Sequence, residues 1–540
     1  MDQPKTLDGM FAASVARFRD RPAFVSMGAA LDYGEVEALS RDFAAFLRGE
    51  LGLAPGERVA LMMPNLLQYP VALAGVLRAG LVVVNVNPLY TASELAFQLE
   101  DSSAAAVVVL ENFAHVLEHA LAGTRVRRVI TTQVGDLFPA PKRWLVNAAV
   151  KHLRHMVPAW RIEGAIAFRA ALARGRALET PVPRHGADDL AFLQYTGGTT
   201  GRPKGAMLTH ANMMANLAQT RAWAGAVLAE GAETVITALP LYHVFSLTAN
   251  LLLFTNLGGT NVLIANPRDL AGFVKTLRGT RFTAITGVNT LYRALLDAPG
   301  FDAVCAANRG MLKISVAGGM AVQRNVAERW QAATGAPLVE GYGLTEASPN
   351  LCANPIDARE FSGALGLPLP GTEVAIVDEE GRALPAGEVG EICARGPQVM
   401  RGYWNAPQET AQAFFPGGWL RTGDLGRIGA RGYVEFVERR KEMIVVSGFK
   451  AYPSEVEAVA MQHPGVQEAG AAAIPDARSG EAVALYVVKR DPALSEQALI
   501  DHCAQQLAPY KRPVKVFFRD ALPKSPIGKV LRRELRPDAP

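Results

Sequence analysis

The sequence predicts a mixed α/β and β protein: a large N-terminal domain of parallel βαβ sheets with a β-rich subdomain, then a small, mobile α+β C-terminal domain. Three features of the chain lead to this prediction. Short apolar runs alternate with amphipathic segments up to about residue 360, as in parallel sheets covered by helices. Strand-rich and turn-rich sequence then extends to about residue 440, and a compact α/β pattern ends the chain.

The apolar runs of the first region predict strands buried on both faces, because they are short and do not alternate with polar residues. We expect such strands at 58–63, 81–86, 105–110, 282–288 and 312–319. The amphipathic segments between them are expected to be the crossover helices of βαβ units.

The stretches 387–404 and 432–448 combine short strands with turns, which indicates antiparallel sheet. In the last region we expect strands at 482–490 and 514–520, with a helix between them that begins at Ser495.

An earlier helix of that region is expected to begin at Ser454, because Ser454 and Glu457 have the spacing of a capping box. The domain boundaries follow from these patterns: a domain at 1–437, a connection at 438–441 and a domain at 442–540.

Length and composition narrow the class of protein. The 540 residues suggest roughly three to four domain-sized units. Hydrophobic residues make up 49% and charged residues 20%, which is typical of a well-cored chain rather than a disordered one. A net charge of +4 is too small to indicate nucleic acid as a partner.

The four cysteines, Cys305, Cys352, Cys393 and Cys503, are far apart and include no C-x-x-C pair. Neither a zinc site nor a disulfide framework is expected, and a reducing compartment is the default. The N-terminus lacks a basic region followed by an apolar core, so we expect no signal peptide. No window is long and apolar enough to predict a transmembrane helix. A cytoplasmic location follows as an expectation.

The stretch YTGGTTGRPKGA, at 195–206, has the composition of a phosphate-binding loop. Its glycines let backbone N–H groups turn toward an anion, Thr196, Thr199 and Thr200 add hydroxyl donors, and Lys204 adds a positive charge. It is not a Walker A loop, since Lys204 precedes its glycine. A flexible surface loop remains the alternative.

The segment 139–160 predicts a basic amphipathic helix that ends at Pro158. Its apolar residues at helical spacing are Val146, Ala149, Val150, Leu153 and Met156, its cations are Lys142, Arg143, Lys151, Arg154 and His155, and Trp144 and Trp160 flank it. Such a helix either lies on an anionic membrane or docks on the protein with a solvated basic face. Both interpretations stay open. His152 and His155 have no carboxylate placed to complete a metal site.

Four further stretches accompany the loop, in this order: GYGLTEASP (341–349), GGWLRTGDLG (417–426), ERRKEMIVVSGFKAYPSEVE (438–457) and LPKSPIGKVLRREL (522–535). Together the five stretches resemble the adenylate-forming enzymes, which include acyl-CoA synthetases, luciferases and peptide-synthetase adenylation domains. The resemblance covers nearly the whole chain. It implies a two-step reaction in which a carboxylate is joined to AMP, with release of pyrophosphate, and a thiol then displaces AMP.

The resemblance also implies roles for individual residues. The expected ATP- and AMP-binding residues are Thr196, Gly197, Gly198, Thr199, Thr200, Lys204, Gly319, Glu340, Gly341, Tyr342, Thr345, Asp424, Arg439 and Lys529. Within this set, Tyr342 is expected to stack on adenine, and Asp424 and Arg439 are expected to bind the ribose. Glu346, with Thr199 beside it, is the expected Mg²⁺ ligand. The expected catalytic residues are Lys529, Thr345, His243 and Lys204.

In such enzymes the small domain rotates between the two steps. The resemblance places the hinge at Lys441 and the channel for the CoA arm at Ser447 and Gly448. Related fatty-acid enzymes often have Asp where this chain has Glu438 and Glu442. Because the charge is kept, we expect little effect from this difference.

The expected acyl pocket is formed by His243, Phe245, Leu247, Gly287 and Gly318. Its walls are neutral, and burial is worth about 0.8 kcal/mol per CH₂, so long chains are favoured. The motifs look most like those of bacterial long-chain fatty-acid–CoA ligases, which act at the inner face of the cytoplasmic membrane. A medium-chain or aryl-acid CoA ligase, a fatty acyl–AMP ligase and a non-catalytic lipid-binding protein remain alternatives. The expected partners are ATP, CoA and a fatty acid, whereas a peripheral contact with an anionic membrane through 139–160 and a homodimer both stay open.

Overall fold

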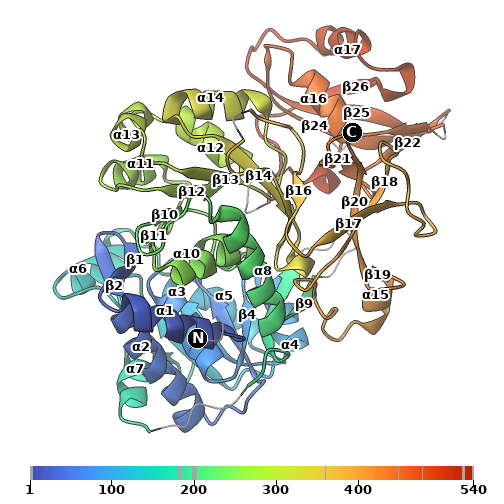
Figure 1. The fold of residues 1–540 in the computed structure, drawn as a ribbon. Coiled ribbons are helices and arrows are strands. Elements are labelled where there is room, and N and C mark those ends of the chain that lie inside the picture. The colour runs from blue at the N-terminus through green and yellow to red at the C-terminus, as the bar shows by residue number, and fades with distance from the viewer. Residues whose placement is uncertain are drawn as a thin grey trace. The chain divides into compact units, whose positions relative to one another are not determined.

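The computed structural model describes residues 4–179, 185–196, 203–358, 360–447, 449–476, 478–525 and 530–537. The chain divides into two compact units (Figure 1). The first comprises Met1–Ser362, Pro368–Thr372 and Arg395–Phe414, and the second comprises Gly363–Leu367, Glu373–Ala394 and Phe415–Pro540. The expected boundary after residue 437 lies within the second unit and stays a prediction.

The first sheet of the first unit has the order β7-β6-β5-β3-β4-β8-β9. Neighbours from β7 to β8 are parallel, and β9 runs antiparallel to β8. Its strands are β3 Arg58–Met62, β4 Val82–Asn85, β5 Ala104–Leu110, β6 Arg128–Thr132, β7 Ile166–Ala167, β8 Leu190–Thr196 and β9 Lys204–Thr209. The strands predicted from the runs at 58–63, 81–86 and 105–110 are therefore confirmed.

From β15 onward, the second sheet of this unit has the order β15-β14-β13-β12-β10-β11-β1-β2, with parallel neighbours from β14 to β1. Its strands are β1 Pro22–Ser26, β2 Ala29–Asp32, β10 Thr234–Thr237, β11 Thr260–Leu263, β12 Ala284–Gly287, β13 Ile314–Ala317, β14 Leu338–Gly343 and β15 Asn350–Ala353. The runs at 282–288 and 312–319 form β12 and β13, as predicted.

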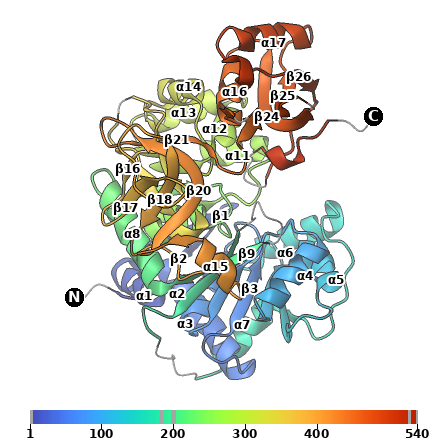
Figure 2. The same ribbon diagram turned by 90° about the vertical axis from the view of Figure 1, so that its right-hand side faces the viewer.

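Helices pack on both sheets and form the apolar cores with them, except that α6 and α15 have no buried residues. Their bounds are α1 Leu7–Phe18, α2 Tyr33–Ala45, α3 Gln68–Arg78, α4 Ala92–Asp101, α5 Ala114–Ala120, α6 Lys142–Ala148, α7 Phe168–Arg176, α8 His210–Ala224, α9 Val244–Ser246, α10 Leu253–Leu257, α11 Leu270–Arg278, α12 Asn289–Leu296, α13 Phe301–Asn308, α14 Arg324–Thr334 and α15 Pro407–Gln412. Helices α11 to α14 gather on one side of the second sheet, where Trp330 is fully buried (Figure 1). Helices α4 and α5 lie beside the first sheet (Figure 2).

The second unit is built from two sheets. The strands of one are β17 Glu373–Val377, β18 Gly390–Arg395, β20 Trp419–Ile428 and β21 Val434–Arg439, and β20 is antiparallel to both β18 and β21. The other contains β22 Ile444–Val446, β23 Phe449–Ala451, β24 Val466–Asp476, β25 Gly480–Lys489 and β26 Lys515–Phe518, together with helices α16 Pro453–Ala460 and α17 Glu496–Ala504. The predicted change from parallel to antiparallel sheet is confirmed.

The predicted start of α17 is confirmed, since the side chain of Ser495 accepts a hydrogen bond from Ala498 N. The capping box predicted at Ser454 is wrong. Tyr452 is the N-cap of α16, and Ser454 lies inside the helix. Its amide and hydroxyl instead donate to the Glu438 carboxylate, at 2.7 and 2.8 Å.

Candidate active site

The motif GYGLTE begins on β14 and continues into a short 3₁₀ helix, Thr345–Ala347. Because β14 is parallel to β13, these residues lie beyond the carboxyl end of a parallel sheet, where α/β proteins bind their ligands. Tyr342, Thr345 and Glu346 are half-buried and therefore keep some contact with solvent. This region gathers the residues expected to bind adenine, the α-phosphate and Mg²⁺.

The two ends of the glycine-rich stretch lie opposite each other, since Thr196 on β8 pairs with Lys204 on β9. Gly197, Gly198, Thr199 and Thr200 lie outside the described residues. A segment far along the chain runs beside β9: Met207 N donates to Gly402 O at 2.9 Å, and Trp404 N donates to Gly205 O at 2.8 Å.

This pairing brings in Tyr403, a residue that the sequence analysis did not identify. Its hydroxyl donates a 2.7 Å hydrogen bond to Glu346 Oε1, and Lys204 Nζ lies 5.0 Å from the centroid of its ring. Burial, with the adjacent Glu346 carboxylate, raises the pKa of Tyr403, so the phenol stays protonated and acts as a donor. A cation, a phenol and a carboxylate thus form one cluster. In the sequence Tyr403 belongs to MRGYWN, which has no recognised local signal linking it to Glu346.

Two glycines after β13 allow backbone to approach the same region closely. Gly319 has φ +78°, a conformation that favours glycine. A Cβ at Gly318 would lie 3.1 Å from the ring of Phe245 and 3.2 Å from Gly341 O. A side chain at position 318 would therefore push into the motif strand.

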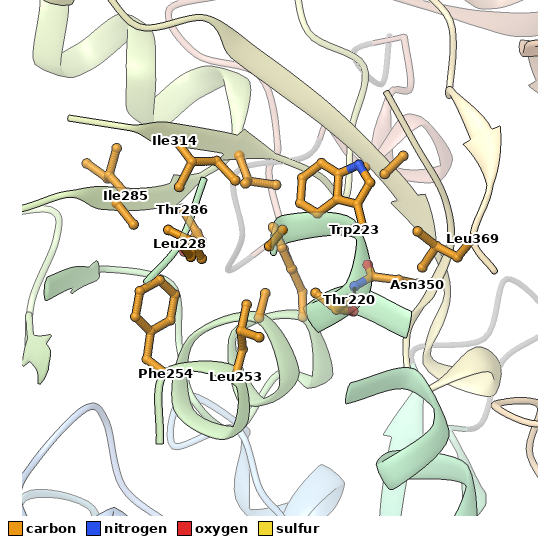
Figure 3. A pocket seen from close by; sticks show the side chains of 17 residues that line it. Thr220, Trp223, Leu228, Leu253, Phe254, Ile285, Thr286, Ile314, Asn350 and Leu369 are labelled. Atoms are coloured by element: carbon orange, nitrogen blue, oxygen red, sulfur yellow. Dashed lines mark hydrogen bonds between the residues drawn. The ribbon is translucent and has the colours of Figure 1, made fainter. Parts of the chain in front are cut away.

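A narrow apolar pocket starts beside Gly341 (Figure 3). It is partly open to solvent, and its accessible lining is almost entirely apolar. Figure 3 shows Phe254, Leu228 and Ile285 facing Trp223 across this space. The described lining residues are Thr220, Trp223, Ala224, Leu228, Phe245, Ala249, Leu253, Phe254, Ala284, Ile285, Thr286, Ile314, Val316, Gly341, Asn350, Ala353 and Leu369, and none of them carries a charge.

Among the residues expected to form the acyl pocket, Phe245 lines this cavity. Leu247 is fully buried and Gly287 ends β12, while Gly318 touches the cavity wall through its closeness to Phe245. The indole N–H of Trp223 donates to Asn354 O at 2.9 Å, which fixes the ring that forms one side of the cavity.

His243 precedes α9, and its Nδ1 accepts a hydrogen bond from Phe245 N at 3.4 Å. Burial lowers the pKa of His243 to about 4, so the imidazole is neutral near pH 7. With Nδ1 accepting, the single ring proton resides on Nε2. His243 can therefore donate one hydrogen bond to a carboxylate without carrying a charge.

Comparison with known proteins identifies the family of the chain. The chain matches the family model described as AMP-binding enzyme over residues 11–404, and the model of the AMP-binding enzyme C-terminal domain over residues 455–529.

The chain belongs to the AMP-binding enzymes. It is 53% identical, over its whole length and 95% of the relative, to a long-chain-fatty-acid–CoA ligase of Escherichia coli O6:H1. It is 32% identical to a 4-coumarate–CoA ligase of Pinus taeda, over 97% of this chain and 93% of that one. A solved ATP-bound RpMatB–BxBclM chimera matches with a TM-score of 0.83 and 30% identity, over 97% and 98% of the two chains. The resemblance to adenylate-forming enzymes and the predicted fold class are confirmed.

In the second unit of this AMP-binding enzyme, Asp424 and Arg439 face each other on the antiparallel strands β20 and β21. Arg439 Nε lies 3.3 Å from Asp424 Oδ1, and the Asp424 amide donates to Thr422 Oγ1 at 3.1 Å. Asp424 is only 7% exposed, so the strand pairing holds its carboxylate in a fixed position.

Glu340 is buried and accepts a 2.8 Å hydrogen bond from Val322 N, which supports the loop that follows Gly319. Burial raises the pKa of Glu340 to about 7. Lys441 is exposed in the turn after β21, and Ser447 has φ +49°. Lys529 and Gly448 lie outside the described residues.

Among the described residues, one group has the arrangement of a metal site: Asp8, His185 and His210, with candidate ligand atoms within 4.8 Å of one another. His185 Nε2 already bonds Asp8 Oδ1 at 2.7 Å, and His210 Nδ1 accepts from Leu7 N at 3.1 Å. A metal bound through His210 would break the bond to Leu7 or leave two protons facing each other, so these contacts favour a hydrogen-bonded cluster.

Proposed function

We propose that this chain is a long-chain fatty acid–CoA ligase, which uses ATP to form a fatty acyl–AMP and then transfers the acyl group to CoA. The observation that carries the proposal is the uncharged, apolar pocket that opens beside Gly341 on the motif strand. Relatives that are 48–53% identical over 93–95% of their length are named long-chain-fatty-acid–CoA ligases, which supports the same substrate class.

For the first step, we assign Lys204 to the β- and γ-phosphates and Thr345 to the α-phosphate. The carboxylate of Glu346 is a hard oxygen donor that fits Mg²⁺, together with Thr199, and Mg²⁺ would neutralise charge on the phosphate oxygens. Tyr403 donates to one oxygen of Glu346 and so fixes its orientation, leaving the other oxygen for the ion.

The acid must attack the α-phosphate while both groups carry negative charge. We assign neutral His243 to the fatty-acid carboxylate, to which it would donate through Nε2 without neutralising the attacking oxygen. We assign Lys529 to the charge that develops between carboxylate and α-phosphate, because stabilising that charge is the main task of phosphoryl-transfer sites.

We also assign residues to the adenine and the ribose of ATP. Tyr342 stacks on adenine, with Glu340 supporting the adjacent loop. Asp424 accepts from the ribose hydroxyls and Arg439 donates to the ribose, and their mutual contact at 3.3 Å holds both groups ready for this. For the second step, the proposal keeps Lys441 as the hinge and Ser447, with Gly448, at the CoA channel.

An aryl-acid ligase is the alternative that the same chemistry would serve. A pocket built for a short aromatic acid needs to enclose one ring only, whereas this cavity is lined from α8, α10, β12, β13 and β15. ATP- and CoA-dependent AMP release, measured for acids from acetate to stearate and for benzoate and coumarate, tests the proposal. A rise toward palmitate and oleate supports it, and a maximum at short or aromatic acids refutes the long-chain assignment.

We further propose that the enzyme contacts an anionic membrane through the segment 139–160. The helix α6 continues as a π-helical turn at Ala149–Leu153 and stops short of Pro158. Val146, Ala149 and Val150 are half-buried against the protein.

Another apolar set of this segment faces solvent: Trp144 is 62% exposed, Leu145 67%, Leu153 77% and Met156 52%. Arg143 stacks on Trp144 at 5.1 Å, and exposed Arg154 and Lys151 lie along the same stretch. Exposed apolar side chains beside cations suit the headgroup region of anionic lipid. Among the described residues, no helix has the length and apolar character to cross a membrane.

Binding to phosphatidylcholine vesicles with and without phosphatidylglycerol tests this contact. The double variant Leu145→Ser, Leu153→Ser is expected to weaken binding to anionic vesicles at least about tenfold, since each side chain loses over 1 kcal/mol of burial. Val514→Ser, at a residue 57% exposed in the other unit, is the matched control. Equal binding by all three proteins would show that the segment only carries a solvated basic face.

A further inference from the structure

A buried ionic cluster surrounds Arg532 in the second unit. Arg532 donates to both oxygens of Glu457, at 2.8 and 2.7 Å, and to Glu438 Oε1 at 2.8 Å. The same guanidinium contacts Glu442. Three carboxylates therefore form ion pairs with one arginine, whose side chain is only 15% exposed.

Within this cluster, Glu438 has an unusual position. It is the last residue but one of the strand β21 and is completely buried. Its Oε2 accepts from the Ser454 amide and hydroxyl, and its Oε1 accepts from Arg532 and from Arg439 N. Ser454 and Arg532 both come after Lys441 in the chain, whereas Glu438 comes before it.

The other two carboxylates lie on the far side of Lys441. Glu442 follows it directly and Glu457 is on α16, so both belong to the same part of the chain as Arg532. Rotation about Lys441 would leave the pairs Arg532–Glu442 and Arg532–Glu457 intact. It would pull Glu438 away from Ser454 and Arg532.

We propose that Glu438 is a positioning residue for the two-step reaction, seated in a socket formed by Ser454 and Arg532 that holds one orientation about Lys441 and must release for the other. This inference rests on the proposed function and on the hinge. A carboxylate that accepts several donors in a buried site is costly to remove from them, because charge-assisted bonds are strong and an emptied socket leaves its donors unpaired. The socket therefore sets how the enzyme divides its time between the two orientations.

The test compares Glu438→Gln with Glu457→Gln in the full-length enzyme. The two half-reactions are measured separately: pyrophosphate–ATP exchange with palmitate for adenylation, and thioester formation from supplied palmitoyl-AMP and CoA. Glu438→Gln is expected to change the ratio of the two rates at least about tenfold, the size of one charge-assisted hydrogen bond. Glu457→Gln is expected to lower thermal stability and to change the ratio clearly less than Glu438→Gln does, because its bonds to Arg532 and Ala471 N do not cross Lys441.

A second readout does not depend on activity. Trypsin recognises Arg439, which ends β21, and Arg440 and Lys441, which follow it in the turn. Cleavage there is expected to accelerate in Glu438→Gln and stay unchanged in Glu457→Gln. Should Glu438→Gln fail to fold, Ser454→Ala removes one donor and is expected to shift the ratio and the cleavage rate in the same direction.

An unchanged ratio and cleavage rate in the folded Glu438 and Ser454 variants, or equal changes in Glu457→Gln, would overturn the inference. If the wild-type enzyme activates no fatty acid, the proposed function fails, and the cleavage rates alone then decide whether the socket exists.

Discussion

Filling the inner part of the apolar pocket should shorten the preferred substrate. Ala284 lines the pocket at the amino end of β12, and Gly287 ends the same strand beside the expected reaction site. Three residues of strand span about 10 Å, roughly the reach of an eight-carbon chain. In Ala284→Phe the ring would occupy the space beyond that reach. If about four methylenes of palmitate lose their burial, the loss is about 3 kcal/mol, or roughly 200-fold in kcat/KM.

The assay is kcat/KM for palmitate and octanoate, measured as AMP release with saturating ATP and CoA. Octanoate is the internal control, because it should end before the new ring and keep its kcat/KM within about threefold. Overpacking is expected to cost about 1–3 kcal/mol of stability, so thermal unfolding confirms that the variant is folded. Equal losses for palmitate and octanoate in a folded variant would refute the assignment of this pocket to the acyl chain.

Three further outcomes are expected. Tyr403→Phe should raise KM for MgATP about tenfold or more, because Glu346 loses a charge-assisted hydrogen bond worth about 1.5–3 kcal/mol; an unchanged KM would argue against an ATP role for this pair. Burial, with the neighbouring histidine, lowers the pKa of His210 from 6.5 to about 4. The unfolded chain then takes up this proton first, so the free energy of unfolding should fall by up to roughly 3 kcal/mol as pH drops through that window. His210→Gln should flatten this decline, and an identical decline in the variant would assign it elsewhere. Gly318→Val should lower activity, since the added Cβ would lie 3.1 Å from the ring of Phe245 in the pocket wall; unchanged activity in the folded variant would contradict that placement.

Much of the fold could be predicted because it depends on local patterns. The runs that form β3, β4, β5, β12 and β13 are short and mostly apolar, since strands in a parallel sheet are buried on both faces. Glycine-rich and charged motifs then follow such strands at the sheet's carboxyl edge, where β14 carries GYGLTE.

Long-range contacts are where prediction failed. Nothing near Tyr403 in the sequence indicates that the segment 400–404 would run beside β9 and meet Glu346. The capping box at Ser454 failed for the same reason. Its local spacing was correct, but the Glu457 carboxylate is occupied by Arg532 and by Ala471 N, from elements that the spacing does not reveal.

Long-range contacts also bear on Glu438 and Glu442, which stand where related fatty-acid enzymes often have aspartate. From charge alone, Glu438 and Glu442 should behave as aspartates would. In the structure both carboxylates reach Arg532, and Glu438 reaches Ser454 as well. The additional methylene of glutamate therefore determines whether the carboxylate can contact Arg532 and Ser454. The variant Glu438→Asp shortens the side chain but keeps its charge, so it distinguishes the effect of length from the effect of charge. If Glu438→Asp changes the half-reaction ratio as Glu438→Gln does, the length of this side chain is needed to hold it in the socket. If only Glu438→Gln changes the ratio, the negative charge alone is enough to hold it there.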